Sequence, residues 1–266
     1  MNDAKALLAA NDLKSAIQAA TSAVKAKPTD TSARTFLFEL LIFAGEFDRA
    51  EKQLDALGQQ DASALIGTQI YRQCIAAEKK RQKVFSADAV PEFITAKPAY
   101  VQMLLDAILA LRNNDYAAAR EKLDKSETER PAIAGKLNGA TDFQDLRDYN
   151  DLTTSIFEVF VKGEYVWLPI EFVKQIKFAP RANLRDIYWT QATIEALDGT
   201  NGEVLLPGLY VGSWQNSDDQ VRLGRATDWS EIGAGDVYQG VGTRLFWMDG
   251  IDQPFTNVET IEFQAQ

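Results

Sequence analysis

The chain has 266 residues, of which 28 are lysine or arginine and 38 are aspartate or glutamate, so its formal net charge is −10. It contains no histidine, and Cys74 is its single cysteine. The lack of histidine excludes Ser-His-Asp triads, Cys-His pairs and His-ligated zinc, and one cysteine excludes an internal disulfide. Because an acidic chain repels nucleic acid and anionic membrane, we expect neither as a partner.

The sequence gives no indication of a membrane or an export route. No run of about 18 apolar residues occurs, so we expect no helix inserted in a membrane. The first residues, MNDAKALLAANDLK, lack a basic segment followed by a long apolar one, so we expect no secretory signal. A single cysteine is compatible with a reducing compartment. We therefore expect a cytoplasmic protein.

Composition changes near residue 136. Positive and negative side chains balance over residues 1–135, whereas residues 136–266 carry the whole net charge of −10 and all 5 tryptophans. A length of 266 residues suits two domains. We therefore predict one domain over residues 1–135 and a second, acidic and tryptophan-rich, over residues 136–266.

A short phrase recurs three times in the first part of the chain. It reads NDLKSAIQAA at residues 11–20, GEFDRAEKQL at 45–54 and NDYAAAREKL at 114–123. The first two copies lie 34 residues apart, which is the period of tetratricopeptide repeats. Each copy opens with a residue that tolerates a left-handed turn between antiparallel helices, namely Asn11, Gly45 or Asn114. The phrase therefore predicts helical hairpins of the tetratricopeptide type, with an ordinary helical bundle as the alternative.

The segment between the second and third copies fits the repeat poorly. Residues 64–85 read as one long amphipathic helix, with Ile66, Ile70, Cys74 and Ala77 on one apolar face. We expect this helix to stack as an irregular repeat and to bury Cys74 as a structural residue.

Stacked helical hairpins present a concave surface that usually binds a peptide or a helix of a partner. In the second repeat, the first helix is expected to project Thr35, Glu39 and Ile42 into this groove. These three residues are therefore our candidate partner-binding residues in the first domain.

After residue 141 the pattern becomes that of short strands separated by turns. Residues 155–161 and 165–170 flank a Lys-Gly-Glu turn and predict a hairpin, and residues 186–197 and 203–211 predict a second one. The remaining expectations are a short helix over residues 170–178 and strands over 220–226, 236–248 and 258–264. The fold class predicted is α+β: tetratricopeptide-like helices, then a small, mainly antiparallel β domain with one or two helices, as a curled sheet or partial barrel.

Arginines of the second domain lie close in sequence to aspartate or tryptophan. Arginine forms bidentate pairs with carboxylates and stacks on tryptophan, so these residues predict either a recognition surface or internal bracing of the sheet. The candidate partner-binding residues here are Arg147, Asp148, Arg185, Asp186, Arg225, Asp228 and Trp229.

The motifs of common enzyme classes are missing. No GxxxxGK[ST] phosphate loop occurs, and the stretch GVGTRLF lacks the third glycine of GxGxxG. Glu158 and Glu164 are a conceivable acid–base pair, although both suit exposed strand positions of a hairpin. We therefore predict a protein that is not an enzyme and needs no cofactor or metal. The alternative is a carboxylate-dependent, metal-assisted hydrolase in the second domain.

The order of motifs in the second domain resembles the ImpE/SciE family, also called TagJ. The matching stretches are TDFQDLRDYND, SIFEVFVKGEYVWLPIEFVKQIKF, PRANLRDIYW, DGTNGEVLLPGLYVGS, LGRATDW and GVGTRLF. This resemblance implies a non-catalytic adaptor of bacterial type VI secretion. It further implies that the partners are the small subunit of the contractile sheath and the AAA+ ATPase that disassembles the sheath.

Overall fold

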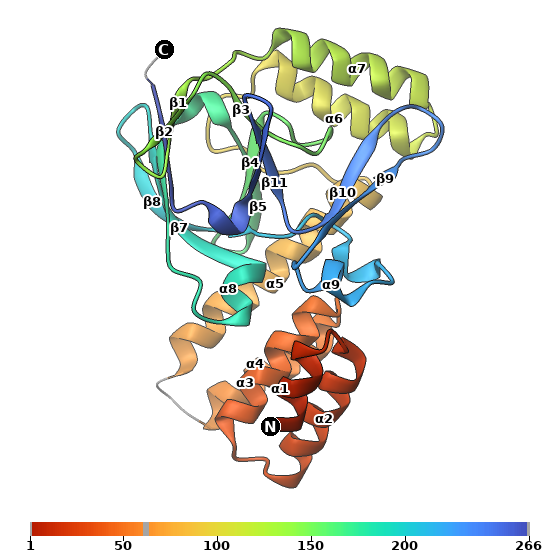
Figure 1. Ribbon diagram of the computed structural model, residues 1–266, viewed down its shortest axis with the longest axis vertical. Coiled ribbons are helices and arrows are strands. Elements are labelled where there is room, and N and C mark those ends of the chain that lie inside the picture. Colours follow the sequence, from red (N-terminus) through yellow and green to blue (C-terminus); the bar gives the residue numbers. More distant parts are fainter. Residues whose placement is uncertain (1, 61–63, 265–266) are drawn as a thin grey trace.

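The computed structural model describes residues 2–60 and 64–264 and contains helices followed by strands (Figure 1). The helices are α1 (Asn2–Ala9), α2 (Leu13–Ala26), α3 (Thr31–Phe43), α4 (Phe47–Gln60), α5 (Leu65–Ser86), α6 (Ala99–Arg112), α7 (Tyr116–Glu129), α8 (Leu184–Tyr188) and α9 (Asp219–Arg222). The predicted class, tetratricopeptide-like helices followed by a mainly antiparallel sheet domain, is confirmed.

Strands begin at residue 135. They are β1 (Gly135–Leu137), β2 (Thr141–Phe143), β3 (Leu146–Asp148), β4 (Ile156–Val161), β5 (Glu164–Pro169), β6 (Val173–Phe178), β7 (Trp189–Ala196), β8 (Asn201–Pro207), β9 (Thr227–Glu231), β10 (Tyr238–Gly242), β11 (Leu245–Met248), β12 (Ile251–Pro254) and β13 (Thr260–Phe263). Short 3-10 turns η2 (Ile170–Phe172), η3 (Ser213–Gln215) and η4 (Phe255–Asn257) join some of them.

The three repeated phrases form the turns that we predicted. Asn11, Gly45 and Asn114 have φ angles of 60°, 70° and 58°, so each adopts the left-handed conformation. Each turn joins two helices, α1 to α2, α3 to α4 and α6 to α7. Aspartate caps the second helix of the first and third hairpins, because the side chains of Asp12 and Asp115 accept hydrogen bonds from the backbone of the following turn.

The hairpins do not form one continuous stack. Figure 1 shows α1–α4 at one end of the molecule and the α6–α7 hairpin at the other, with α5 running between them. α5 packs against α4 as far along as Lys79, which pairs with Glu51, and it also packs against β5 and β4. The segment therefore packs on the second hairpin, as expected of an irregular repeat, but part of its buried face is covered by the sheet.

The strands build an antiparallel sheet with the order β2-β1-β13-β6-β7-β8-β4-β5. Both predicted hairpins are confirmed, as β4–β5 and β7–β8. Two smaller sheets pair β9 with β10, and β3 with β11 and β12. Residues 173–178, predicted to be helical, form strand β6, and residues 219–222 form helix α9 where we predicted a strand.

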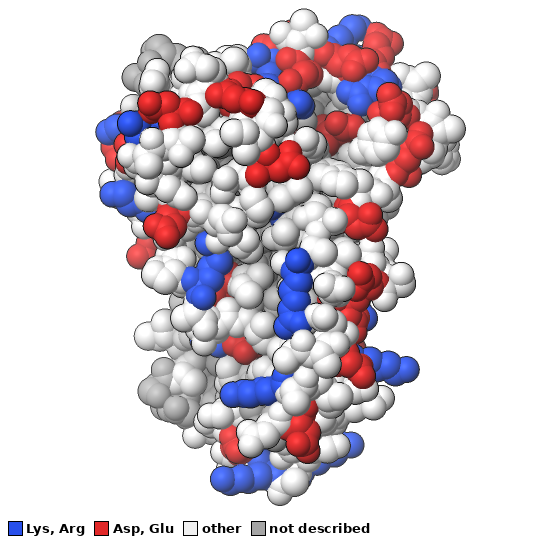
Figure 2. Space-filling view, in the orientation of Figure 1, with Lys and Arg blue, Asp and Glu red and all other residues white. Residues whose placement is uncertain are grey.

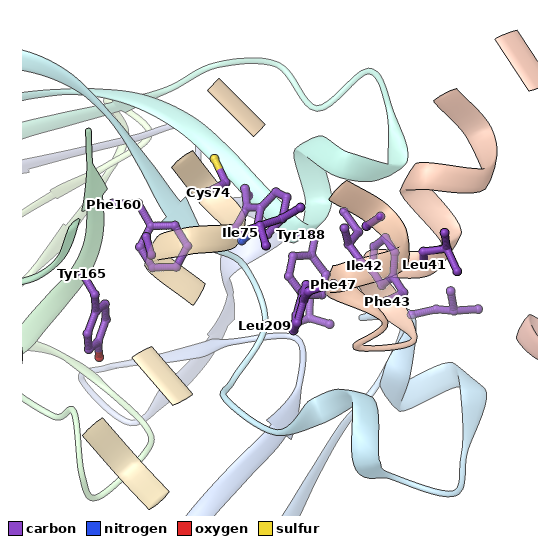
Figure 3. Close-up of a cluster of buried hydrophobic side chains, with 14 of the residues drawn as sticks. Leu41, Ile42, Phe43, Phe47, Cys74, Ile75, Phe160, Tyr165, Tyr188 and Leu209 are labelled. Atoms are coloured by element: carbon purple, nitrogen blue, oxygen red, sulfur yellow. The ribbon is translucent and has the colours of Figure 1, made fainter. Parts of the chain in front are cut away.

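Two hydrophobic clusters form the core. One lies within the curled sheet and includes Phe157, Phe246 and Phe255. The other joins residues of the helices to residues of the sheet domain, and Figure 3 shows Ile42, Phe43 and Cys74 in it together with Phe160 and Tyr188. The division into domains at residue 135 stays a prediction, since this second cluster crosses that point in the sequence.

The surface is charged but mixed. On the face shown in Figure 2, acidic and basic side chains are interspersed, and no continuous basic area is visible. Across residues 2–60 and 64–264, no helix has both the length and the apolar character to cross a membrane.

Candidate protein-binding groove

A groove opens where the second helical hairpin meets the start of α5. It has a volume of about 320 Å³ and lies between α3, α4, α5 and α8. Its lining residues are Thr31, Thr35, Phe38, Leu54, Leu57, Ala64, Gly67, Thr68, Tyr71 and Arg185. We call this surface the α3–α5 groove. Phe38, Leu54 and Leu57, which we call its floor, are apolar, and Thr31, Thr35 and Thr68 add hydroxyl groups, a composition that suits binding of a partner side chain.

Arg185 from α8 closes one end of the groove. Its Nε donates a hydrogen bond to Tyr71 Oη at 2.9 Å, and its guanidinium also pairs with the Glu39 carboxylate and lies 5.4 Å from the Tyr71 ring centre. Burial raises the pKa of Glu39, although Arg185 opposes this shift. Arg185 therefore fixes Tyr71 and Glu39 at the junction between the helices and the sheet domain.

Exposed apolar side chains follow the start of α5 beside the groove. Leu65, Ile66 and Ile70 are 50%, 78% and 41% exposed. We predicted that Ile66 and Ile70 share a buried face with Cys74 and Ala77, and this is wrong for the first two. Cys74 and Ala77 are buried because they pack at the junction with the sheet domain, which the first turns of α5 do not reach.

The structure places the three candidate residues of α3 differently. Thr35 lines the groove and is half-buried. Glu39 is 7% exposed and is held by Arg185. Ile42 is fully buried in the core, since it points away from the groove into the cluster of Figure 3. Thr35 is thus the residue of this set that a partner reaches in this conformation.

Two of the candidate arginine and aspartate residues, Arg147 and Asp148, make their contacts within the chain. Asp148 is fully buried, pairs with Arg244 at 3.1 Å and accepts a hydrogen bond from Tyr210 Oη at 3.0 Å. Burial raises the pKa of Asp148, and Arg244 opposes that shift. Arg147 lies over the Trp247 ring at 4.9 Å. These contacts are the internal bracing that we considered as the alternative to a recognition surface.

The remaining candidates of the second domain lie in three places. Arg225 donates a hydrogen bond to the Leu8 carbonyl at 3.0 Å, and therefore ties the sheet domain to α1. Asp186 caps α8 together with Asn183. Asp228 is exposed on β9, and the Trp229 ring lies 5.7 Å from that of Tyr210.

The sheet domain contacts the turns of the first two helical hairpins. Asp219 of α9 accepts a hydrogen bond from the Leu13 backbone N–H at 2.7 Å, at the start of α2. The Trp214 ring packs against Gly45. Since Arg225 reaches the first turn as well, the loop end of the hairpins is covered, and the α3–α5 groove lies on another side of α3 and α4.

A buried ionic network joins α5 to the sheet. Arg81 donates to both oxygens of Glu158, at 2.7 and 3.1 Å, to Glu78 at 3.2 Å and to the Leu209 carbonyl at 3.0 Å. Arg244 also pairs with Glu158. Glu158 therefore uses its two oxygens for structure, whereas its conceivable partner Glu164 is exposed and pairs with Lys80.

No group of three or more potential metal ligands occurs in the part of the chain that the structure describes. Sequence reasoning missed most of the groove. Phe38, Leu57 and Tyr71 lie at unremarkable apolar positions, and Arg185 is 114 residues from Tyr71. Only the repeat spacing, which placed Thr35 on the inner face of its hairpin, was a usable signal.

Both halves of the chain match models of known protein families. The family model described as ImpE protein matches residues 140–262, and a tetratricopeptide repeat model matches residues 7–67. A Pseudomonas aeruginosa protein named type VI secretion system accessory component TagJ is 31% identical over 261 residues, covering 98% of this chain and 91% of the relative. The crystal structure of protein VPA1032 from Vibrio parahaemolyticus superposes with a TM-score of 0.90 at 25% identity, covering 99% of this chain and 98% of the other.

Proposed function

The chain belongs to the ImpE family, and on this basis we propose that it is an accessory protein of a bacterial type VI secretion system. It acts in the cytoplasm as a non-catalytic adaptor that binds the small subunit of the contractile sheath. It links this subunit to the AAA+ ATPase that disassembles the sheath. The proposal is supported by the similarity to TagJ over nearly the whole length of both chains.

The observation that carries the binding mode is the α3–α5 groove. An apolar floor flanked by Thr35 and Tyr71 suits a helix that inserts apolar side chains at intervals of three and four residues. The exposed Leu65, Ile66 and Ile70 extend this apolar surface along the start of α5. Contiguous exposed apolar surface of this kind marks interaction sites in proteins.

Filling the groove tests this proposal. The variant Thr35→Arg places a long charged side chain over the apolar floor, so we expect binding of the purified sheath small subunit to weaken at least tenfold. Ser32→Arg is the matched control, because Ser32 is exposed on the same helix and is not among the groove residues. Isothermal titration calorimetry measures both affinities, and circular dichroism verifies that both variants fold.

Two outcomes would contradict the proposal. If the wild-type chain does not bind the sheath subunit, the adaptor role is wrong. If Thr35→Arg binds as tightly as Ser32→Arg, the adaptor role stands but the groove is not its site. The link to the ATPase is tested by adding that protein to the complex, since a linker retains both partners on size-exclusion chromatography.

A further inference from the structure

Arg112 differs from every other arginine of the chain. Each of the others donates a hydrogen bond or forms an ion pair with an acceptor. The Nε and Nη1 atoms of Arg112 are buried, and no acceptor for them is found among the described residues. A buried donor without an acceptor loses its hydration without gaining a hydrogen bond, and this loss is largest for a charged group. Arg112 is therefore available to pair with an acceptor that a ligand brings.

Arg112 faces a cavity of about 190 Å³ at the end of α6. The other lining residues are Phe85, Ile108, Leu111, Leu152, Ile232 and Gln239. Most of this wall is apolar, and none of the lining residues is acidic, although the chain as a whole carries a net charge of −10. The guanidinium therefore lies in an apolar pocket without a counter-ion from the pocket itself.

A second cavity of about 230 Å³ adjoins the first, because both are lined by Phe85 and Gln239. It contributes two further buried donors without acceptors, the amide of Gln82 and the indole Nε1 of Trp214. We call the two cavities together the Arg112 trough. It combines one cation, two neutral donors and an apolar wall.

We propose that the Arg112 trough binds a carboxylate carried on a small apolar group. A carboxylate supplies acceptor oxygens for the guanidinium, and a charge-assisted hydrogen bond of this kind is stronger than a neutral one. The apolar carrier fills the part of the cavity lined by Phe85, Ile108 and Leu152. Free small carboxylates and the C-terminal carboxylate of a peptide share this chemistry.

This site is separate from the α3–α5 groove. Thr68 and Tyr71 of α5 line the groove, whereas Gln82 and Phe85 of the same helix line the trough. A rise of 1.5 Å per residue puts the two sets roughly 20 Å apart along the helix axis. Failure of the groove proposal would leave the trough proposal untouched, and the reverse also holds.

Titration of the ¹⁵N-labelled full chain with hexanoate tests the proposal. We expect millimolar hexanoate to shift the indole N–H signal of Trp214 and the Nε–H signal of Arg112, the former assigned with Trp214→Phe. Hexanamide, which has the same carrier without the charge, should bind at least tenfold more weakly. Acetate, which has the charge without the carrier, should also bind more weakly.

Variants locate the site. Arg112→Gln should reduce hexanoate affinity at least tenfold, whereas Arg112→Lys, which keeps the charge, should retain part of it. Lys83→Gln is the matched control, because it removes a positive charge from an exposed position of α5 and should leave the affinity unchanged. If Arg112→Gln does not fold, the comparison of hexanoate with hexanamide on the wild-type chain decides alone.

The same titration overturns the proposal if no signal shifts at tens of millimolar hexanoate. It is also overturned if hexanamide binds the wild-type chain as tightly as hexanoate does, or if Arg112→Gln binds hexanoate as tightly as the wild-type chain does. A further titration distinguishes a free small carboxylate from the C-terminal carboxylate of a peptide. A tetrapeptide ending in leucine with a free C-terminus should bind more tightly than hexanoate, and more tightly than its own C-terminal amide, if the natural ligand is a peptide end. Tighter binding of hexanoate assigns a free small carboxylate.

Discussion

Position 45 makes two demands that only glycine, among the amino acids, satisfies together. Its φ of 70° is unfavourable for a side chain, and a Cβ added there would lie 2.5 Å from Cδ2 of Trp214. We predict that Gly45→Ala lowers the free energy of unfolding by about 2–4 kcal/mol, of which about 1–2 is backbone strain and the rest displacement of the Trp214 ring. Urea denaturation followed by circular dichroism measures the change.

Gly139 provides the control for this substitution. It has a φ of 68°, but nothing lies within 4 Å of an added Cβ. Gly139→Ala should therefore cost only the backbone strain, about 1–2 kcal/mol. Equal losses in the two variants would show that the contact between Trp214 and the turn contributes nothing to stability.

The reactivity of the Cys74 thiol is a second property that depends on a single residue. Its side chain is 1% exposed, and burial raises the pKa of its thiol, with the Glu78 carboxylate as a second cause in the same direction. Because only the thiolate reacts, we predict that iodoacetamide fails to modify the folded chain at pH 8–9 and modifies it fully in urea. Mass spectrometry counts the adducts, and rapid labelling without urea would disprove the buried, protonated state.

At the scale of elements, α5 determines how the two halves of the chain meet. Removing Arg81 leaves the buried carboxylates of Glu78 and Glu158 without this partner, and breaking a buried pair in this way costs about 3–5 kcal/mol. We predict a loss of this size for Arg81→Met in urea denaturation. Lys80→Met is the control, since its pair with Glu164 is exposed on both sides and should contribute less than about 1 kcal/mol.

The elements also show how far sequence reasoning reaches. The helical hairpins were predictable because their turns need left-handed residues at a fixed spacing, as at Gly45. Strand β6 was not, because a bulge between Val173 and Gln175 lets Val173 and Ile176 face the same core at the three-residue spacing of a helix. Helix α9 spans a single turn whose start is marked only by the Asp218 cap.

The candidate site was harder to predict for a different reason. Glu39 and Asp148 are charged, and charged residues are usually exposed, so both were assigned to a surface. Each is buried because an arginine far away in sequence neutralises it, Arg185 in one case and Arg244 in the other. Tertiary pairing of this kind leaves no periodic signal in a single sequence.

The whole molecule has a core that runs across the junction of helices and sheet. Residues of α3, α4 and α5 share one hydrophobic cluster with Ile156, Tyr165, Trp167 and Trp189, and Arg81 anchors the same junction. Elements that share a buried core lose their packing together, so the helices and the sheet domain should unfold as one cooperative unit.

The distribution of chromophores makes this last prediction measurable. All 5 tryptophans lie after residue 136, whereas the long helices that dominate ellipticity at 222 nm end at Glu129. Tryptophan fluorescence therefore reports on the sheet domain and ellipticity on the helices. We predict coincident urea transitions for the two probes in the wild-type chain. In Arg81→Met both transitions should shift together to lower urea, because the hydrophobic cluster still joins α5 to the sheet. Separate transitions already in the wild-type chain would show that the junction is too weak to couple the two halves.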